Sequence, residues 1–147
     1  VSHTGNQFAK NTIFSTDWSS ILLGYHSYPA KRHNLVFGVW NNKKWQQKFL
    51  GSTSPLNYQH IVGVADRSAG KIMVFVNGKY KGKIKWDGTI QRSNTWNLGI
   101  QASPKWEEKE RGNPDIIIDE IRLYNRALSA DEVKELYLFT SAFPPVE

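Results

Sequence analysis

The amino-acid sequence predicts an all-β fold, an antiparallel β-sandwich followed by one short C-terminal helix. Three observations predict it. Short runs in which apolar and polar residues alternate recur along the chain, with turn-forming residues between them. An Asn-Gly dipeptide separates two runs of β-forming residues. A single helix-start signature occurs late in the sequence, after the last of these runs.

Alternation and turn signals place the strands. We expect strands at residues 34–40, 44–50, 60–67, 95–102 and 115–124. In the first of these, Leu35, Phe37 and Val39 share one face, and Trp40 lies on the other. A polar turn at residues 41–44 leads into the second strand.

The clearest hairpin is "KIMVFVNGKYKGKIKW", in which Asn77-Gly78 favours a two-residue type I′ turn. Strict alternation along its second strand puts four lysines on one face, with Tyr80, Ile84 and Trp86 on the other. These lysines are Lys79, Lys81, Lys83 and Lys85. Such a row either attracts anionic polymers or keeps an exposed strand soluble, and we favour the second interpretation.

The helix is expected at about residues 130–138. Ser129 is a good N-cap residue, and Glu132 three positions later completes a capping box. Leu128 and Val133 occupy the positions of a hydrophobic staple. Pro144-Pro145 ends regular structure soon afterwards.

Composition narrows the class of protein. The 147 residues, 39% hydrophobic and 22% charged, suit one globular domain with a real core. The absence of cysteine excludes disulfides, thiolate metal sites and cysteine nucleophiles. No apolar run reaches the ~20 residues of a membrane-spanning helix. The net charge of +6 allows an anionic partner without requiring one, and no motif indicates nucleic-acid recognition.

Three segments together resemble a known family. They are "HIVGVADRSAGKIMVFVNGKYKG", "WNLGIQ" and "IIIDEIRLYNRALSADEVKELY", and the likeness extends over about residues 34–137. They resemble the laminin-G-like, concanavalin A-like lectin and glucanase jelly-roll domains. The resemblance implies two curved antiparallel sheets packed face to face. It also implies a module that binds carbohydrates or proteins, often in a secreted or cell-surface protein, and in many cases holds Ca²⁺.

We therefore expect residues 1–147 to form a single jelly-roll domain. The family normally has additional strands before the region equivalent to "SSILLGYHS", whereas few residues precede "NLVFGVW" here. The front strands are either lost or rebuilt, or they are supplied from elsewhere.

Aromatic residues beside polar ones suggest where a sugar would bind, because sugar C–H faces stack on Trp and Tyr rings. Residues 24–34 read as a loop rich in Tyr, His and cations, and residues 39–45 place two Trp around an Asn/Lys turn. Trp106 lies in a charged loop, whereas Trp96 beside Leu98 is expected in the core. The predicted carbohydrate-binding residues are Tyr25, His26, Tyr28, Arg32, Trp40, Asn42, Trp45 and Trp106.

Asp119 breaks the pattern of the last predicted strand, because it shares a face with Ile117, Ile121 and Leu123. A buried carboxylate must be hydrogen-bonded, paired, metal-bound or protonated. Backbone hydrogen bonds, a structural Ca²⁺, a cationic partner and a misassigned register all remain open. For calcium, the accompanying oxygen ligands are Asp115 and Asn113.

The sequence gives no catalytic signature. Asp119 and Glu120 point to opposite faces of the predicted strand, so they do not form a glycosidase pair. The leading hypothesis is a non-catalytic carbohydrate-binding module whose partner is a glycan, neutral or anionic. The alternatives are a protein–protein adhesion module and a polysaccharide-active hydrolase or lyase on the same fold.

Overall fold

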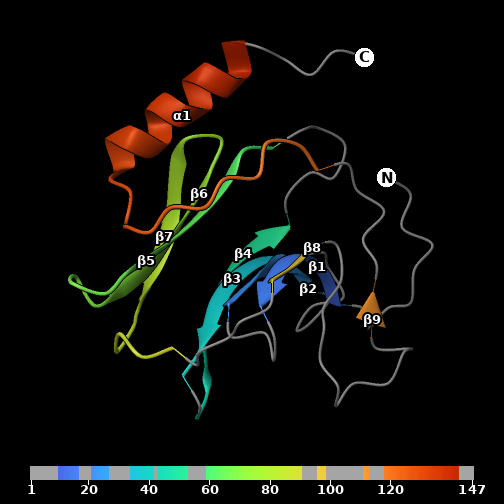
Figure 1. Cartoon of the computed structure of the whole chain (residues 1–147), viewed down its shortest axis with the longest axis vertical. Coiled ribbons are helices and arrows are strands. Elements are labelled where there is room, and N and C mark those ends of the chain that lie inside the picture. The colour runs from blue at the N-terminus through green and yellow to red at the C-terminus, as the bar shows by residue number, and fades with distance from the viewer. Residues whose placement is uncertain are drawn as a thin grey trace.

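The computed structural model of the chain describes residues 10–16, 21–26, 34–41, 43–52, 59–90, 96–98, 111–112 and 118–142. These residues form three layers: a large sheet, a small sheet and a helix (Figure 1). The two sheets and the late helix confirm the predicted β-sandwich with a C-terminal helix. No helix in this described part is long and apolar enough to cross a membrane.

The large sheet is built mainly from the first half of the chain. Its strands are β1 (Lys10–Thr16), β2 (Ile21–His26), β3 (Asn34–Trp40), β4 (Trp45–Ser52), β8 (Trp96–Leu98) and β9 (Arg111–Gly112). They pair in the order β4-β3-β2-β1-β8, and β9 also pairs with β1. The predicted strand at residues 34–40 is β3, and the next prediction corresponds to β4. Strand β2 includes residues 24–26, so the predicted loop at residues 24–34 begins three residues too early.

The small sheet is an antiparallel meander of β5 (Ile61–Asp66), β6 (Lys71–Val76) and β7 (Lys79–Lys85). Strands β6 and β7 join through Asn77 and Gly78, whose φ angles of 51° and 70° are the two positive values that a type I′ turn requires. The hairpin prediction is therefore confirmed.

The predicted row of four lysines on one face is wrong, because β7 contains a β-bulge. Tyr80 pairs with Phe75 and Gly82 pairs with Val74, which leaves Lys81 as the extra residue. The bulge reverses the alternation, so Lys79 lies on the face opposite to Lys83 and Lys85.

Helix α1 (Ala130–Ala142) begins as the sequence predicts. The backbone N–H of Ser129 donates to Glu132 Oε2 at 2.8 Å, and the N–H of Glu132 donates to Ser129 Oγ at 3.2 Å, which is a reciprocal capping box. Arg126 forms an ion pair with Glu132 at 2.7 Å and, with the capping bond, lowers the pKa of Glu132 to about 2. The predicted staple residues, Leu128 and Val133, are both buried.

The small sheet has an apolar face on each side. Between the sheets, Ile72, Val74 and Trp86 pack with Phe37 and Val39 of β3. On the other side, Val64 and Phe75 pack with Leu128, which precedes helix α1, and with Val133 of that helix. Burial of such side chains contributes about 1.5–3 kcal/mol each, so both interfaces stabilise the fold.

Gly63 of β5 lies directly against Phe37 of β3 across the interface between the sheets. A Cβ atom there would lie 2.5 to 2.7 Å from carbons of the Phe37 ring. Because Phe37 is buried, the ring has little room to move away. A glycine at this position therefore sets the spacing between the two sheets.

The predicted strand at residues 115–124 is wrong over the part that the structure describes. Residues 118–128 belong to no strand or helix and cross the side of the small sheet toward α1 (Figure 1). The apolar side chains of residues 118–124 are exposed, as Leu123 at 63% shows. Glu120 has a positive φ of 53°, a conformation that β-strands do not use. Leu98 of β8 is also exposed, at 55%, whereas the side chain of Trp96, which was expected in the core, lies outside the described part of the chain.

Replacement of Gly63 by alanine tests the sheet spacing. The added methyl group overlaps the Phe37 ring, so we expect Gly63→Ala to lower the free energy of unfolding by about 1–3 kcal/mol. Urea denaturation measures the change. The matched control is Gly63→Ala combined with Phe37→Leu, in which the loss relative to Phe37→Leu alone should be smaller. Equal losses in the two backgrounds would contradict the contact.

Candidate functional site

The candidate site lies at one end of the sandwich, where three chain segments meet. They are the β3–β4 turn (residues 41–44), the β5–β6 turn (residues 67–70) and the segment after β7 (residues 86–89). The backbone N–H of Trp86 donates to the Gly70 carbonyl at 2.8 Å, which joins the segment after β7 to the β5–β6 turn. We call this region the loop end. It lies on the side of the sandwich away from helix α1, toward the lower left of Figure 1.

Asp87 connects the loop end to both sheets. Its Oδ1 accepts hydrogen bonds from the Thr89 hydroxyl at 2.6 Å, the Thr89 N–H at 2.9 Å and Gln46 Nε2 at 3.1 Å. Its Oδ2 accepts from Asn41 Nδ2 at 2.7 Å. These donors, Thr89 first, hold the pKa of Asp87 far below its ordinary value. The carboxylate is therefore ionised at neutral pH and serves as an acceptor.

Asn41, which Asp87 holds, makes further hydrogen bonds within the β3–β4 turn. Its Oδ1 accepts from the backbone N–H groups of Lys43 and Lys44 at 3.1 and 2.9 Å. Its own N–H donates to the Lys44 carbonyl at 3.3 Å. The side chain is 8% exposed, although the residue sits at a hairpin tip. The turn is thus held by one buried amide, which Asp87 in turn orients.

The turn pairs Trp40 directly with Trp45 across β3 and β4. Trp40 lies on the face opposite to Phe37 and Val39 and is partly buried, which confirms the face predicted for it. The side chain of Trp45 lies outside the described part of the chain. The structure thus brings together two of the predicted sugar-binding positions at the head of an ordered hairpin.

The other predicted binding residues are placed less completely. Tyr25 and His26 belong to β2, opposite Leu35 and Asn34 of β3, and their side chains fall outside the described set. The remaining four predicted residues lie outside the described part of the chain altogether: Tyr28, Arg32, Asn42 and Trp106.

Asp119 is not a buried carboxylate on an apolar strand face. It is exposed, and its Oδ1 accepts a hydrogen bond from the Glu120 N–H at 2.9 Å. Glu120 instead pairs with Arg122 at 2.6 Å. Asn113 and Asp115 lie outside the described residues, within which no group of three His, Asp or Glu side chains could hold a metal ion.

The sequence did not identify the network around Asp87. An Asp two residues before a Thr, just after a strand, is a local turn signal and accounts for the Thr89 contacts. The bonds from Asn41 and Gln46, by contrast, join residues 46 and 41 positions apart. Only the packing of the two sheets brings these side chains together.

The chain belongs to the Concanavalin A-like lectin/glucanases superfamily, whose family model matches residues 2–134. No curated protein sequence matches it significantly. A crystal structure of a proposed carbohydrate-binding protein from Bacteroides ovatus ATCC 8483 is similar, with a TM-score of 0.64 and 20% identity. An S-layer domain-containing protein (residues 221–444) from Clostridium thermocellum ATCC 27405 has a TM-score of 0.48 and 17% identity.

The two matches cover 87% and 88% of this chain. The chain in turn spans 36% of the Bacteroides structure and 64% of the Clostridium one. At these identities the Bacteroides structure supports the fold, which is the jelly-roll sandwich implied by the sequence resemblance.

Proposed function

We propose that this chain is a non-catalytic carbohydrate-binding module and that the β3–β4 hairpin at the loop end contacts the sugar. The observation that carries the proposal is the Trp40–Trp45 pair at the head of a hairpin fixed by Asn41 and Asp87. Membership of a lectin and glucanase superfamily supports the same class of ligand.

The chemistry of the hairpin suits a sugar. An indole ring covers the apolar C–H face of a pyranose, while nearby polar groups exchange hydrogen bonds with its hydroxyls. Asp87 and Thr89 are exposed beside the hairpin and provide a carboxylate and a hydroxyl. Because Asp87 is already oriented by four hydrogen bonds, little conformational entropy is lost when a ligand binds there.

The ionisation of the described carboxylates at the loop end supports a binding role over hydrolysis. A glycosidase needs one carboxyl group whose pKa is raised so that it can protonate the leaving oxygen. Asp87 has the opposite property. The pKa of Asp66 is lowered as well, by hydrogen bonds from the Ala69 N–H and the Ser68 hydroxyl. Neither is suited to act as a general acid at neutral pH.

The proposal includes two further features suggested by the family resemblance. One is that the module belongs to a secreted or cell-surface protein. The other is a structural Ca²⁺ near residues 113–119, with Asp119, Asp115 and Asn113 as ligands. The exposed position of Asp119 leaves its second carboxylate oxygen accessible to solvent, although Oδ1 already accepts a backbone hydrogen bond.

Trp40→Ala tests the carbohydrate site. Loss of the indole removes the stacking surface, so we expect the affinity for the polysaccharide that the wild type binds to fall about tenfold, or about 1.4 kcal/mol. Affinity electrophoresis against a panel of neutral and acidic polysaccharides measures it. Trp40→Phe should keep part of the affinity. Tyr124→Ala, at an exposed aromatic residue near the helix, is the control.

Two outcomes would reject this function. One is the absence of retention on every polysaccharide, and the other is a Trp40→Ala variant that folds and binds like the wild type. Capture of a protein partner that no sugar displaces would favour the adhesion alternative. Release of oligosaccharides would instead identify an enzyme.

The calcium proposal has its own test. Binding to the folded state raises the melting temperature, so added Ca²⁺ should raise it and EDTA should reverse the rise. Asp119→Asn should remove the effect, because it takes away a charged ligand. A melting curve unchanged by Ca²⁺ would exclude the site.

A further inference from the structure

The loop end gathers exposed basic side chains from two of its three segments and from β7, the strand that leads into the third. Lys43 and Lys44 are in the β3–β4 turn, Arg67 is in the β5–β6 turn, and Lys85 closes β7; all four are exposed. The contact that a Cβ on Gly88 would make with Arg67 Cγ, at 3.2 Å, shows that Arg67 lies beside the segment after β7. We call these four residues the loop-end cations.

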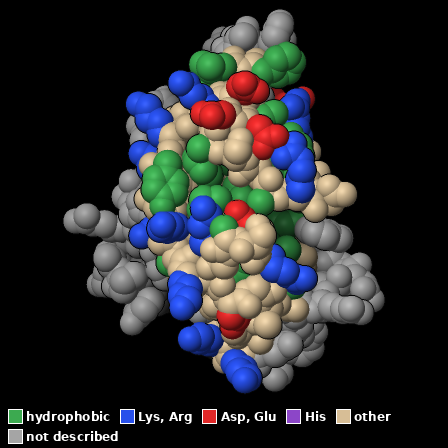
Figure 2. All heavy atoms as spheres, turned by 90° about the vertical axis from the view of Figure 1, so that its left-hand side faces the viewer, with side chains coloured by type: hydrophobic (Ala, Val, Ile, Leu, Met, Phe, Trp, Pro, Cys, Tyr) green, Lys and Arg blue, Asp and Glu red, His purple; other side chains and the backbone are tan. Residues whose placement is uncertain are grey.

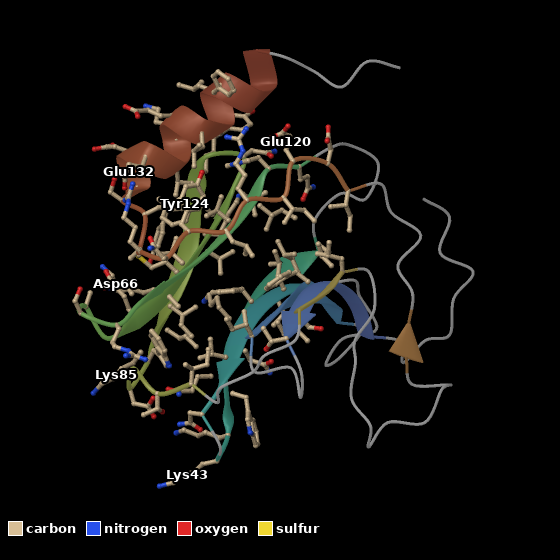
Figure 3. The ribbon with its side chains drawn as sticks, viewed as in Figure 1. Lys43, Asp66, Lys85, Glu120, Tyr124 and Glu132 are labelled. Carbon is tan, nitrogen blue, oxygen red and sulfur yellow. The ribbon has the colours of Figure 1, made fainter. Side chains whose placement is uncertain are left out.

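The figures place these cations away from the helix. In Figure 3, Lys43 and Lys85 lie at the lower end of the molecule and extend outward, whereas Glu120 and Glu132 lie near α1. Figure 2 shows basic side chains over the whole of this face, its lower part included, and acidic ones gathered mainly at the top.

The sequence gives the same asymmetry of charge. The loop-end cations and the neighbouring Lys71 provide five positive charges against Asp66 and Asp87, a net charge of +3. Residues 118–142 carry five carboxylates and three cations, a net charge of −2. An anion approaching the protein is therefore drawn toward the loop end.

The positive charges at the loop end are not neutralised by ion pairs. Within the described part of the chain, the ion pairs are Arg122–Glu120 and Arg126–Glu132, both next to the helix. Both carboxylates at the loop end accept hydrogen bonds from neutral donors instead. None of the loop-end cations forms a salt bridge with another described residue, so their charges are available to a ligand.

A pair of like charges supports this interpretation. Lys71 of β6 and Lys85 of β7 are direct cross-strand partners, an arrangement that disfavours folding. Asp66 is opposite Lys71 on β5 and offsets one of the two charges. A bound anion would offset the second.

The cations also adjoin the proposed stacking surface. Lys43 and Lys44 lie in the turn between Trp40 and Trp45, which are paired across the hairpin. A sugar ring stacked on Trp40 would thus have its substituents within the reach of long, flexible lysine side chains. A carboxylate or sulfate on that ring would gain a charge-assisted hydrogen bond that a hydroxyl does not provide.

We propose that the loop-end cations make this module selective for anionic polysaccharides, whose uronate or sulfate groups they bind while a sugar ring stacks on Trp40. This inference rests on the proposed function and narrows it to one class of glycan. Uronates and sulfated sugars share the recognised chemistry, an anionic group on a pyranose ring. The experiment separates the two sources.

The test uses two pairs of polymers matched in backbone: polygalacturonate with its carboxyl-reduced form, and dextran sulfate with dextran. We expect the wild type to bind at least one anionic polymer about tenfold more tightly than its neutral counterpart. The preference should shrink as NaCl rises from about 0.05 to 0.3 M, because salt screens exposed charges. Preference within the first pair identifies uronate, and preference within the second identifies sulfate.

The variant combines Lys43→Gln, Lys44→Gln and Lys85→Gln, and should lose the preference for the anionic polymer. The matched control combines Lys79→Gln, Lys81→Gln and Lys134→Gln, three exposed lysines outside the loop end, and should keep the preference. Melting curves check that each variant is folded. An equal loss in the control would mean that net charge alone acts, and would overturn the proposal.

Three further outcomes are decisive. Equal binding to charged and neutral polymers, with Trp40→Ala weakening both, would overturn this inference and leave the proposed function intact. Binding to none of the polymers used here or in the wider panel would overturn both. Retention on duplex DNA as strong as on the best polysaccharide, and insensitive to Trp40→Ala, would assign the surface to nucleic acid and overturn the polysaccharide assignment.

Discussion

The hydrogen bonds that converge on Asp87 connect the parts of this molecule on which its proposed function depends. The residue follows β7 of the small sheet, and two of its donors, Asn41 and Gln46, belong to the β3–β4 hairpin of the large sheet. The apolar interface between the sheets, in which Gly63 lies against Phe37, holds the sheets together. The hydrogen bonds of Asp87 also orient the β3–β4 hairpin relative to the small sheet, because each bond has a preferred geometry that apolar packing lacks.

The proposed site follows from this arrangement. Asn41 is oriented by Asp87 and in turn accepts hydrogen bonds from the backbone N–H groups of Lys43 and Lys44, which holds these two residues in place between Trp40 and Trp45. The acidic groups at this end are occupied by neutral donors, which leaves the surrounding cations without internal partners in the described part of the chain. The same hydrogen bonds therefore shape the stacking surface and leave the positive charge beside it exposed.

Local chemistry made some of this predictable from the sequence. The Asn77-Gly78 turn and the Ser129–Glu132 capping box depend on residues at most three apart, and both are present. The lysine face was predicted wrongly because one extra residue at Lys81 reverses the alternation. Gly82 directly after it, with a φ of 142°, is the sequence signal that could have indicated the bulge. The segment before the helix has strand-like residues yet forms no strand over 118–124, since strand formation also needs a paired neighbour. The hydrogen bonds from Asn41 and Gln46 to Asp87 join residues far apart in the sequence, so only the fold could reveal them.

The most direct test of the central claim is the pH dependence of unfolding of the wild type and Asp87→Asn, measured with urea. Because folding lowers the pKa of Asp87, its ionised carboxylate stabilises the fold at pH values above 3.8, the ordinary pKa of the group. This contribution is lost as the pH falls below 3.8. The wild type should be the more stable at pH 7, and the difference should shrink steadily below pH 3.8. A difference that is absent at neutral pH, or that stays constant into acid, would contradict the role assigned to Asp87.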